Sequence, residues 1–304
     1  MTRFRYPVVS PRLETVSAIF LIAENLSSVW AIGTFYAELM QAVVRRSLQL
    51  LRCSQRAAGF FLAWCLLPAV GTLDAAHAQG TTVSITPLSA AGGEQPPAPW
   101  RVVGIPGGKI PLTSFSMVKQ DGIKVVRIEA RQSYGNLVHA LAGAPVPAPG
   151  QQLRWRWRLD RPLPAADLGR KAGDDSPVKV CALFDQPLDR LSLVDRTLLR
   201  LARAASAESL PSATLCYVWD ARLPAGTVLS NAYTGRVKLM VLDSGEQRLG
   251  EWSVHSRDLA LDFRLAFGGE GDTVPPWTAV LVGADADNTG GSSLAFVGDI
   301  GFGP

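Results

Sequence analysis

Alternating apolar and polar residues dominate the chain from about residue 100 onward. In the run from Leu153 to Leu159, leucine and tryptophan fall on one face and three arginines on the other. A period of two residues is typical of a strand with one buried face. Eight further short runs are rich in β-branched or aromatic residues and are bounded by Gly, Pro, Asp or Asn: 101–105, 123–130, 137–141, 178–184, 213–219, 236–242, 278–282 and 294–300. The pattern predicts packed antiparallel sheets.

Two segments follow a helical period instead. In 188–205, apolar side chains recur every three or four positions with arginines between them, which predicts an amphipathic helix. A second helix is predicted from Ser256, as its N-cap, to a left-handed C-cap at Gly268. We therefore expect residues 100–304 to form one all-β domain, a jelly-roll-like antiparallel β-sandwich with one or two accessory helices.

The composition of the chain changes near residue 78. From Met40 the chain runs through a basic stretch, an apolar stretch at 57–73 and the small-residue motif Ala76-His77-Ala78. This is the order of a secretory signal peptide, which we place at 40–78. The mature protein is therefore expected to be periplasmic or secreted, with no membrane span.

The segments on either side of this signal peptide are expected to lie outside the folded domain. Residues 79–99 are rich in Thr, Ser, Gly and Pro without apolar periodicity, which predicts a disordered linker. Residues 1–39 fit a wrongly assigned N-terminal extension better than a membrane segment, because such a segment would place Glu24 in its interior.

Charge and histidine content exclude several classes of function. Residues 1–78 hold seven arginines and four acidic residues and so account for +3 of the formal net charge of +4. The remainder is nearly neutral and has no dense basic run, which argues against nucleic-acid binding. Its two histidines, His139 and His255, do not form a zinc motif, and nucleotide-binding and serine-hydrolase motifs are lacking. We interpret His255 as a helix-start residue, not as part of a triad with Ser256 and Asp258.

Two cysteines, Cys181 and Cys216, lie in predicted strands. An exported protein can join them by a disulfide if the strands are neighbours with Cα atoms within about 7 Å. The alternative is a pair of small buried apolar side chains. The sequence leaves both interpretations open.

An acidic turn, Asp285-Ala286-Asp287-Asn288-Thr289-Gly290, separates the last two predicted strands. Its first half matches an EF-hand loop, but Phe296 occupies the position of the bidentate glutamate. One interpretation is a structural Ca²⁺ ion, the only cofactor considered, with four candidate ligands: Asp285, Asp287, Asn288 and Asp299. The other is an Asx-rich loop that satisfies its own backbone.

Further acidic residues begin or end predicted strands, namely Asp174, Asp175 and Asp220. If their loops share a rim with the acidic turn, a carboxylate cluster forms there. Glycosidases use carboxylate pairs about 5 or 7–9 Å apart, which makes Asp174, Asp175 and Asp287 the catalytic candidates. The simpler interpretation is that these acids cap turns.

Exposed tryptophans can stack on sugar rings, whereas buried ones fill a core. Trp252 and Trp277 lie beside polar or proline-rich segments and are the tryptophans expected to be exposed. The candidate ligand-binding residues are Asp220, Trp252, Trp277, Asp285, Asp287 and Asn288.

Several motifs occur together in the order found in one bacterial family. They are Leu153-Arg154-Trp155-Arg156-Trp157, Lys171-Ala172-Gly173-Asp174-Asp175, Tyr217-Val218-Trp219-Asp220, Arg257-Asp258-Leu259, Asp262-Phe263-Arg264, the acidic turn, and Gly298-Asp299-Ile300. Over residues 137–303 the chain resembles DUF3047, a family of uncharacterised exported proteins. The resemblance implies an exported β-sandwich, similar in outline to jelly-roll carbohydrate-binding modules, and supplies no activity or ligand.

We expect the chain to be a non-catalytic protein that binds a saccharide or another cell-envelope ligand. The first alternative is an acid/base carboxylate enzyme of glycoside hydrolase or lyase type. The second is a structural envelope-assembly protein that acts through its helix at 188–205.

Overall fold

The computed structural model describes residues 83–105, 109–205, 210–270 and 273–304. The expected N-terminal extension and signal peptide lie outside the described residues. Within them, no helix is both long and apolar enough to span a membrane.

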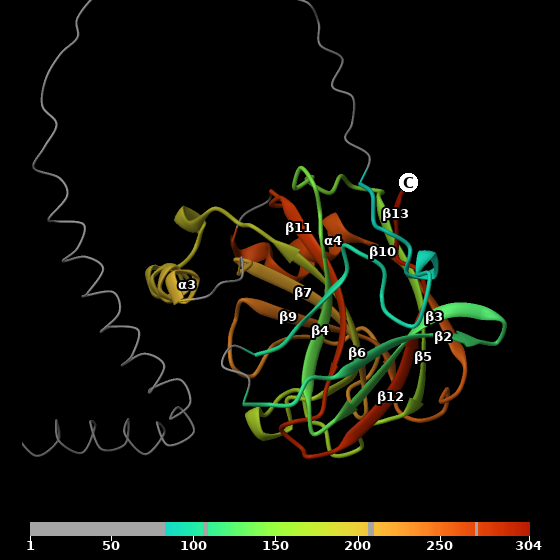
Figure 1. The fold of residues 1–304 in the computed structure, drawn as a ribbon. Helices are drawn as coiled ribbons and strands as arrows, with labels where there is room; N and C mark the ends of the chain where they lie inside the picture. The colour runs from blue at the N-terminus through green and yellow to red at the C-terminus, as the bar shows by residue number, and fades with distance from the viewer. Residues whose placement is uncertain (1–82, 106–108, 206–209, 271–272) are drawn as a thin grey trace, which may run out of the picture. The chain divides into compact units, whose positions relative to one another are not determined.

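Two β-sheets pack face to face, as the alternation predicts (Figure 1). The seven-stranded sheet has the order β1 (Arg101–Val103), β4 (Tyr134–Ala140), β11 (Trp277–Asp285), β6 (Ser176–Phe184), β7 (Ala213–Asp220), β9 (Val237–Ser244) and β8 (Val228–Ser230). The six-stranded sheet has the order β10 (Trp252–Asp258), β5 (Gln152–Arg161), β12 (Ser292–Val297), β3 (Ile123–Arg131) and β2 (Ser114–Gln120), and β13 (Gly301–Gly303) pairs with β5. All strand pairs are antiparallel except β7 with β9. The predicted jelly-roll-like sandwich is confirmed.

In the part of the chain that the structure describes, two α-helices accompany the sheets, and neither has the predicted boundaries. α3 (Leu193–Ala205) projects from the side of the sandwich (Figure 1) and follows the 3-10 turn η3 (Leu188–Arg190). α4 (Leu259–Phe267) follows β10 directly and leads into η4 (Gly268–Glu270).

The caps of α4 differ from those expected. Asp258 is the N-cap, and its Oδ1 accepts hydrogen bonds from the amides of Ala260 and Leu261 at 3.0 Å each. Ser256 lies inside β10, which continues pairing with β5 as far as Asp258. Gly268 ends the helix in a right-handed conformation, with φ of −58°. The carboxylate cap is the stronger start signal, because it satisfies two orphan amides of the first turn.

The inner faces of the sheets form one core. On β5 the alternating residues Leu153, Trp155, Trp157 and Leu159 are at most 3% exposed. They pack against side chains of β6 and β7, and Trp155 lies 5.0 Å from Tyr217 between ring centroids. The outer face of the seven-stranded sheet carries a second apolar cluster, in which Cys181 and Cys216 form a cross-strand disulfide.

Residues 83–99 do not form the expected linker but pack on the sandwich. Leu88, in the 3-10 turn η1 (Leu88–Ala90), is fully buried in the core. Trp100 Nε1 donates to the carbonyl oxygen of Thr86 at 2.8 Å, and the Thr86 amide donates to His139. A few apolar residues are enough to hold this polar segment on the domain, because Ile85, Leu88 and Ala91 are buried in the core.

Candidate functional site

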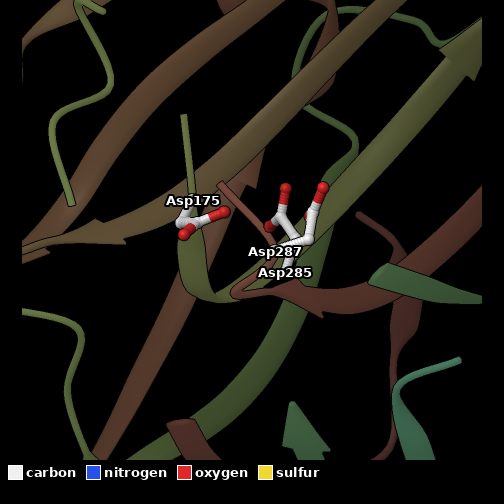
Figure 2. A group of neighbouring side chains, drawn as sticks. All are labelled: Asp175, Asp285 and Asp287. Atoms are coloured by element: carbon white, nitrogen blue, oxygen red, sulfur yellow. The ribbon is translucent and has the colours of Figure 1, made fainter. Parts of the chain in front are cut away.

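The pairing of β6 with β11 brings two acidic loops together. The strands are antiparallel, with Ser176 opposite Asp285, so the loop before β6 meets the turn after β11 at one end of the seven-stranded sheet. One carboxylate oxygen from each of Asp175, Asp285 and Asp287 lies within 4.8 Å of the other two. Figure 2 shows Asp285 and Asp287 together, with Asp175 coming from the other loop. We call these three residues, with the adjoining Asp174, the acidic cluster.

A buried lysine supplies positive charge to the acidic cluster. Lys179 Nζ lies 3.0 Å from Asp285 Oδ1, and each side chain is 11% exposed. Burial alone would lower the pKa of Lys179, but the nearby acidic groups outweigh burial and raise this pKa. The pKa of Asp285 is also raised, because burial and the charge of Asp175 outweigh Lys179. The shift of Lys179 follows from the surrounding negative charge, whereas the shift of Asp285 follows first from burial and then from the charge of Asp175.

The position of Lys179 depends on a glycine on the neighbouring strand. A Cβ at Gly283 would overlap Asn136 Oδ1 and would lie 3.1 Å from Lys179 Cε. Because Gly283 has no side chain, the side chain of Lys179 can pass over it. The lysine ammonium group then lies 5.0 Å from the ring centroid of Tyr134. Asn136 Nδ2 donates to the hydroxyl of the same tyrosine at 3.0 Å. These contacts fix the cation beside Asp285.

Asp175 organises the acidic turn through its backbone. Its carboxylate accepts hydrogen bonds from the amide of Asn288 at 3.1 Å, the amide of Thr289 at 2.7 Å and the Thr289 hydroxyl. Asn288 Nδ2 donates to the carbonyl oxygen of Asp174 at 3.0 Å. Much of the turn is therefore satisfied by hydrogen bonds within the protein, as the Asx-loop interpretation describes.

Asp287 is the member of the acidic cluster with unused hydrogen-bonding capacity. Its Oδ1 is buried and has no hydrogen-bond partner among the described residues. Burial, followed by the charges of Asp285 and Asp175, raises the pKa of this half-buried carboxyl. A buried acceptor without a donor lowers the stability of the folded protein, and a new hydrogen bond to this carboxylate would recover part of that free energy.

An exposed aromatic ring borders the acidic cluster. Tyr233 is 52% exposed, and its hydroxyl lies 3.0 Å from the carbonyl oxygen of Lys171 and 3.2 Å from Asn288 Oδ1. Lys171 Nζ lies 5.4 Å from the centroid of the tyrosine ring. The same loop is tied to the cluster by Asn231, whose Nδ2 donates to Asp174 Oδ2. The site therefore combines acceptors, a buried cation and an aromatic surface.

The structure does not bring the predicted tryptophans to this site. Trp277 is fully buried at the first position of β11, with its ring 4.8 Å from that of Phe302, so it is a core residue and not an exposed one. Trp252 lies on the outer face of the other sheet, where Nε1 donates to Asp121 Oδ2 at 2.9 Å and Arg156 lies over its ring. A single site that joins these rings to the acidic cluster is excluded.

Two predicted aspartates also lie outside the cluster. Asp299 is at the opposite end of β12 from the acidic turn, and its carboxylate accepts from the amide and hydroxyl of Ser89 at 2.8 and 2.6 Å. It is therefore not a ligand of an ion bound at Asp285 and Asp287. Asp220 caps its own turn by accepting from the amides of Arg222 and Leu223. A strand-ending aspartate is commonly held by its own loop in this way.

Sequence reasoning missed Lys179 and Tyr233, although each left a signal. Lys179 is the charged residue within the otherwise apolar strand β6. Tyr233 is an aromatic residue in the polar loop after β8. His255 was also misinterpreted, because it lies in β10 with Nε2 2.9 Å from Asp243 Oδ2 and not at a helix start.

The carboxylates could also hold a divalent cation. Three oxygens within 4.8 Å of one another form part of a Ca²⁺ site, which prefers six to eight oxygen ligands. Lys179 already neutralises part of this charge, and Asn288 is engaged elsewhere. The donor set therefore fits a weakly held ion better than a structural one.

We expect Asp287→Asn to raise the free energy of unfolding at pH 7 by about 1 kcal/mol. The folded-state pKa of Asp287 lies above its ordinary value of 3.8, so ionisation destabilises the fold as the pH rises through that folded-state pKa. The gain in unfolding free energy should disappear as the pH falls toward 3.8, the ordinary pKa of an aspartate. Urea unfolding at several pH values measures it, with Asp299→Asn as the control that gains nothing. A loss of stability at pH 7 would mean that a bound cation or donor depends on Asp287.

The fold and site define a two-layered β-sandwich protein with an acidic site at one end of its larger sheet. Residues 98–301 match the family model described as "Protein of unknown function (DUF3047)". The chain therefore belongs to this family, which confirms the resemblance seen in its motifs. No curated protein matches the chain.

Solved structures with a similar chain path include three glycoside-degrading proteins. A family 12 xyloglucanase from Bacillus licheniformis aligns with a TM-score of 0.36 and 11% identity, over 66% of this chain and 89% of that one. The xyloglucanase domain of NopAA, a type three effector from Sinorhizobium fredii in complex with cellobiose, has a TM-score of 0.34 and 9% identity over 67% and 92%. Endoglucanase 3 of family GH12 from Trichoderma harzianum has a TM-score of 0.33 and 9% identity over 68% and 99%. No residue role follows from likeness at this level.

Proposed function

We propose that this protein is an exported, non-catalytic binder of a neutral saccharide, held at the acidic cluster. The observation that carries the proposal is the exposed ring of Tyr233, whose hydroxyl contacts Asn288 of the acidic turn, next to Asp287 of the acidic cluster. A sugar presents an apolar face that packs on an aromatic ring and hydroxyls that donate to carboxylates. A sugar hydroxyl would donate to the half-buried carboxylate of Asp287, which has a spare acceptor among the described residues.

The charge of the site favours a ligand without negative charge. Four carboxylates of the acidic cluster face one buried ammonium group, and the raised pKa of Asp174, due first to burial and also to the charge of Asp285, reflects this excess. An acidic saccharide would be repelled by the same field. A neutral saccharide, which donates hydrogen bonds and adds no charge, fits the site best.

Export is part of this proposal and rests on two observations. The leader has the order of a signal peptide, and the domain carries the disulfide between Cys181 and Cys216. Disulfides persist in oxidising compartments such as the periplasm. A protein in that location meets the polysaccharides of the cell envelope.

An acid/base enzyme is the second candidate, favoured by the raised pKa of Asp287 beside Asp285. A carboxyl group with a raised pKa suits proton donation to a leaving group. Asp175 is less suited to a catalytic role because the backbone of the acidic turn occupies its oxygens. If the protein cleaves its ligand, Asp287→Asn should abolish product formation while binding remains measurable.

The binding proposal predicts unequal effects of two aromatic substitutions. On an array of neutral glycans, Tyr233→Ala should weaken binding by about tenfold, which corresponds to about 1.4 kcal/mol. Trp252→Ala is the matched control, because this tryptophan lies on the outer face of the other sheet. Its binding should equal that of the parent protein. Equal losses in both variants, or no glycan bound by the parent protein, would contradict the proposal.

A further inference from the structure

A cavity lies between the edges of the two sheets, where β9 and β8 face β10. Its volume is about 560 Å³, within the range of small-molecule sites. The larger apolar residues that line it are Val228, Met240, Leu242, Val254 and Leu265. The polar side chains that line it are His255, Ser256 and Arg257, and no acidic side chain is among the described lining residues.

Arg257 is held rigidly at this cavity. Its Nε and Nη2 donate to the carboxylate of Asp262 at 2.8 and 2.6 Å, and Nη2 also contacts Met240 Sδ at 3.4 Å. Asp262 is 5% exposed and accepts from the Tyr217 hydroxyl at 2.8 Å, which fixes the carboxylate in turn. These contacts do not use Nη1, and the arginine side chain remains 34% exposed. A positioned guanidinium with an unused edge suits a carboxylate ligand.

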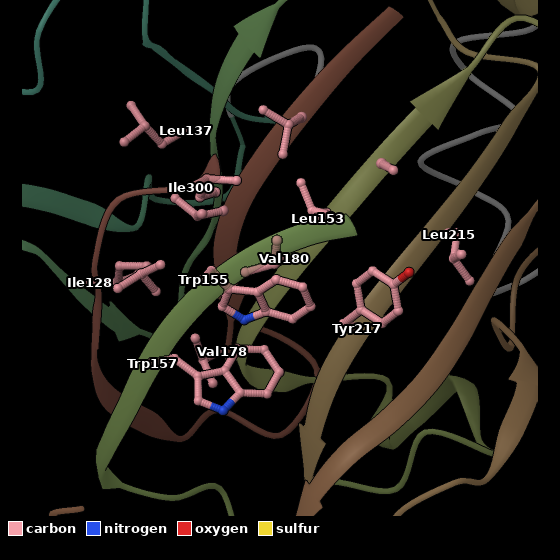
Figure 3. Close-up of a cluster of buried hydrophobic side chains, with 14 of the residues drawn as sticks. Ile128, Leu137, Leu153, Trp155, Trp157, Val178, Val180, Leu215, Tyr217 and Ile300 are labelled. Carbon is pink, nitrogen blue, oxygen red and sulfur yellow. The ribbon is translucent and has the colours of Figure 1, made fainter. Parts of the chain in front are cut away.

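His255 is fixed in the same manner. Its Nε2 donates to Asp243 Oδ2 at 2.9 Å, and the same oxygen accepts from Trp157 Nε1 at 2.6 Å. The ring centroid lies 5.3 Å from that of Trp155 and 4.8 Å from that of Trp157. Figure 3 shows these two indoles projecting from β5 toward Tyr217. The imidazole ring is therefore held in place by these contacts. His255 and Arg257 are two residues apart and lie on the same face of β10.

The apolar wall of the cavity continues onto the protein surface. Leu265, which lines the cavity, is 68% exposed, and Leu261, four residues earlier on α4, is 56% exposed. These two leucines share one face of the helix and form an apolar strip that begins at the cavity. A ligand with an apolar tail would cover this strip and gain from its burial.

We propose that this cavity binds an aliphatic monocarboxylate of the fatty-acid class. Its carboxylate pairs with Arg257 at Nη1, and its chain lies along Met240 and Leu265. The site is separate from the acidic cluster, because neither Tyr233 nor any residue of that cluster is among the residues that line the cavity. This proposal does not depend on saccharide binding, and either can fail without the other.

Calorimetric titration of the full chain with sodium decanoate, below its micelle concentration, tests the proposal. Decanoate should bind saturably at one site, and decanol, which has the same chain without the charge, should bind about tenfold more weakly. Decyltrimethylammonium, with the opposite charge, should not bind. Non-saturable uptake of decanoate, or equal affinity for decanoate and decanol, would overturn the proposal.

Two variants separate this cavity from nonspecific apolar binding. Leu265→Asp places a negative charge in the proposed path of the chain and should abolish decanoate binding. Leu193→Asp is the matched control, because this α3 leucine is also mostly exposed, at 77% against 68% for Leu265. It should bind like the parent protein, and equal effects of the two substitutions would contradict the assignment.

A third variant, Arg257→Gln, tests the carboxylate contact. It should weaken decanoate about tenfold and leave decanol unchanged. Equal weakening of both ligands would argue against a carboxylate contact at this arginine. If this variant does not fold, the comparison of Leu265→Asp with Leu193→Asp decides the question.

Discussion

Replacing Lys179 with methionine should lower the free energy of unfolding by about 3–5 kcal/mol. The substitution keeps the apolar stem but removes the charge that lies 3.0 Å from Asp285 Oδ1. Both partners are buried, so the remaining carboxylates would be left without their cation. Chemical denaturation at pH 7 measures the loss. Lys119→Met, on the exposed surface of β2, is the control and should change stability little.

Two additions show whether the loss comes from uncompensated charge. Lys179→Met combined with Asp285→Asn should recover part of the stability, because it removes one of the unpaired carboxylates. Calcium should raise the melting temperature of Lys179→Met more than that of the parent protein, because the vacated carboxylates become available to the ion. If Lys179→Met costs less than about 1 kcal/mol, the lysine is not the charge that holds the cluster together.

Replacing Asp243 with alanine should cost about 3 kcal/mol, the second of the two largest effects. Its carboxylate accepts from the fully buried Trp157 and from His255, and both would lose their acceptor. Arg248 Nη1 lies 3.4 Å from the other oxygen. Glu251→Ala is a matched control, because this glutamate pairs with the same arginine at 3.6 Å but is 64% exposed. Removal of such a surface pair should cost less than about 1 kcal/mol.

The contribution of Asp243 should depend on pH with a defined sign. Burial alone would raise the pKa of Asp243, but hydrogen bonds from His255 and Trp157 outweigh burial and hold it below the ordinary value of 3.8. Asp243 therefore contributes its full stabilisation of the folded protein at pH values above 3.8. This contribution is lost as the pH falls through the lower folded-state pKa. The difference between the parent protein and Asp243→Ala should shrink in that acidic range. A difference that stays constant down to pH 2 would contradict the assignment.

The sequence specifies the sandwich because burial imposes a period on each strand. On β5 the buried side chains of Leu153, Trp155, Trp157 and Leu159 alternate with arginines. This pattern is typical of a strand with one buried and one solvent-facing side. The helix at 188–205 was recognised by its own period. Its start was misplaced, because Leu188–Arg190 forms a separate 3-10 turn before Leu193.

The acidic cluster could be predicted only in part, because it depends on strand order. Asp285 and Asp287 are neighbours in sequence, whereas Asp175 joins them through the pairing of β6 with β11. No local pattern encodes which strands pair. The same limit hid the link between Asp243 and His255, which lie in strands of different sheets.

Exposure of single aromatic residues was the least predictable feature. Trp277 stands beside Pro275 and Pro276 in the sequence, yet it begins a central strand and is fully buried. Tyr233 has similar polar neighbours and is half exposed. The neighbouring residues in the sequence do not predict which of these two rings is buried. Burial depends on whether the residue enters a central strand or stays in a surface loop.

A crystal structure of the protein with a neutral oligosaccharide selected on the glycan array would test the saccharide proposal most directly. The account predicts a sugar ring packed on Tyr233, with one of its hydroxyls donating to the Asp287 carboxylate. A sugar bound instead at Trp252, with the acidic cluster unchanged, would contradict it.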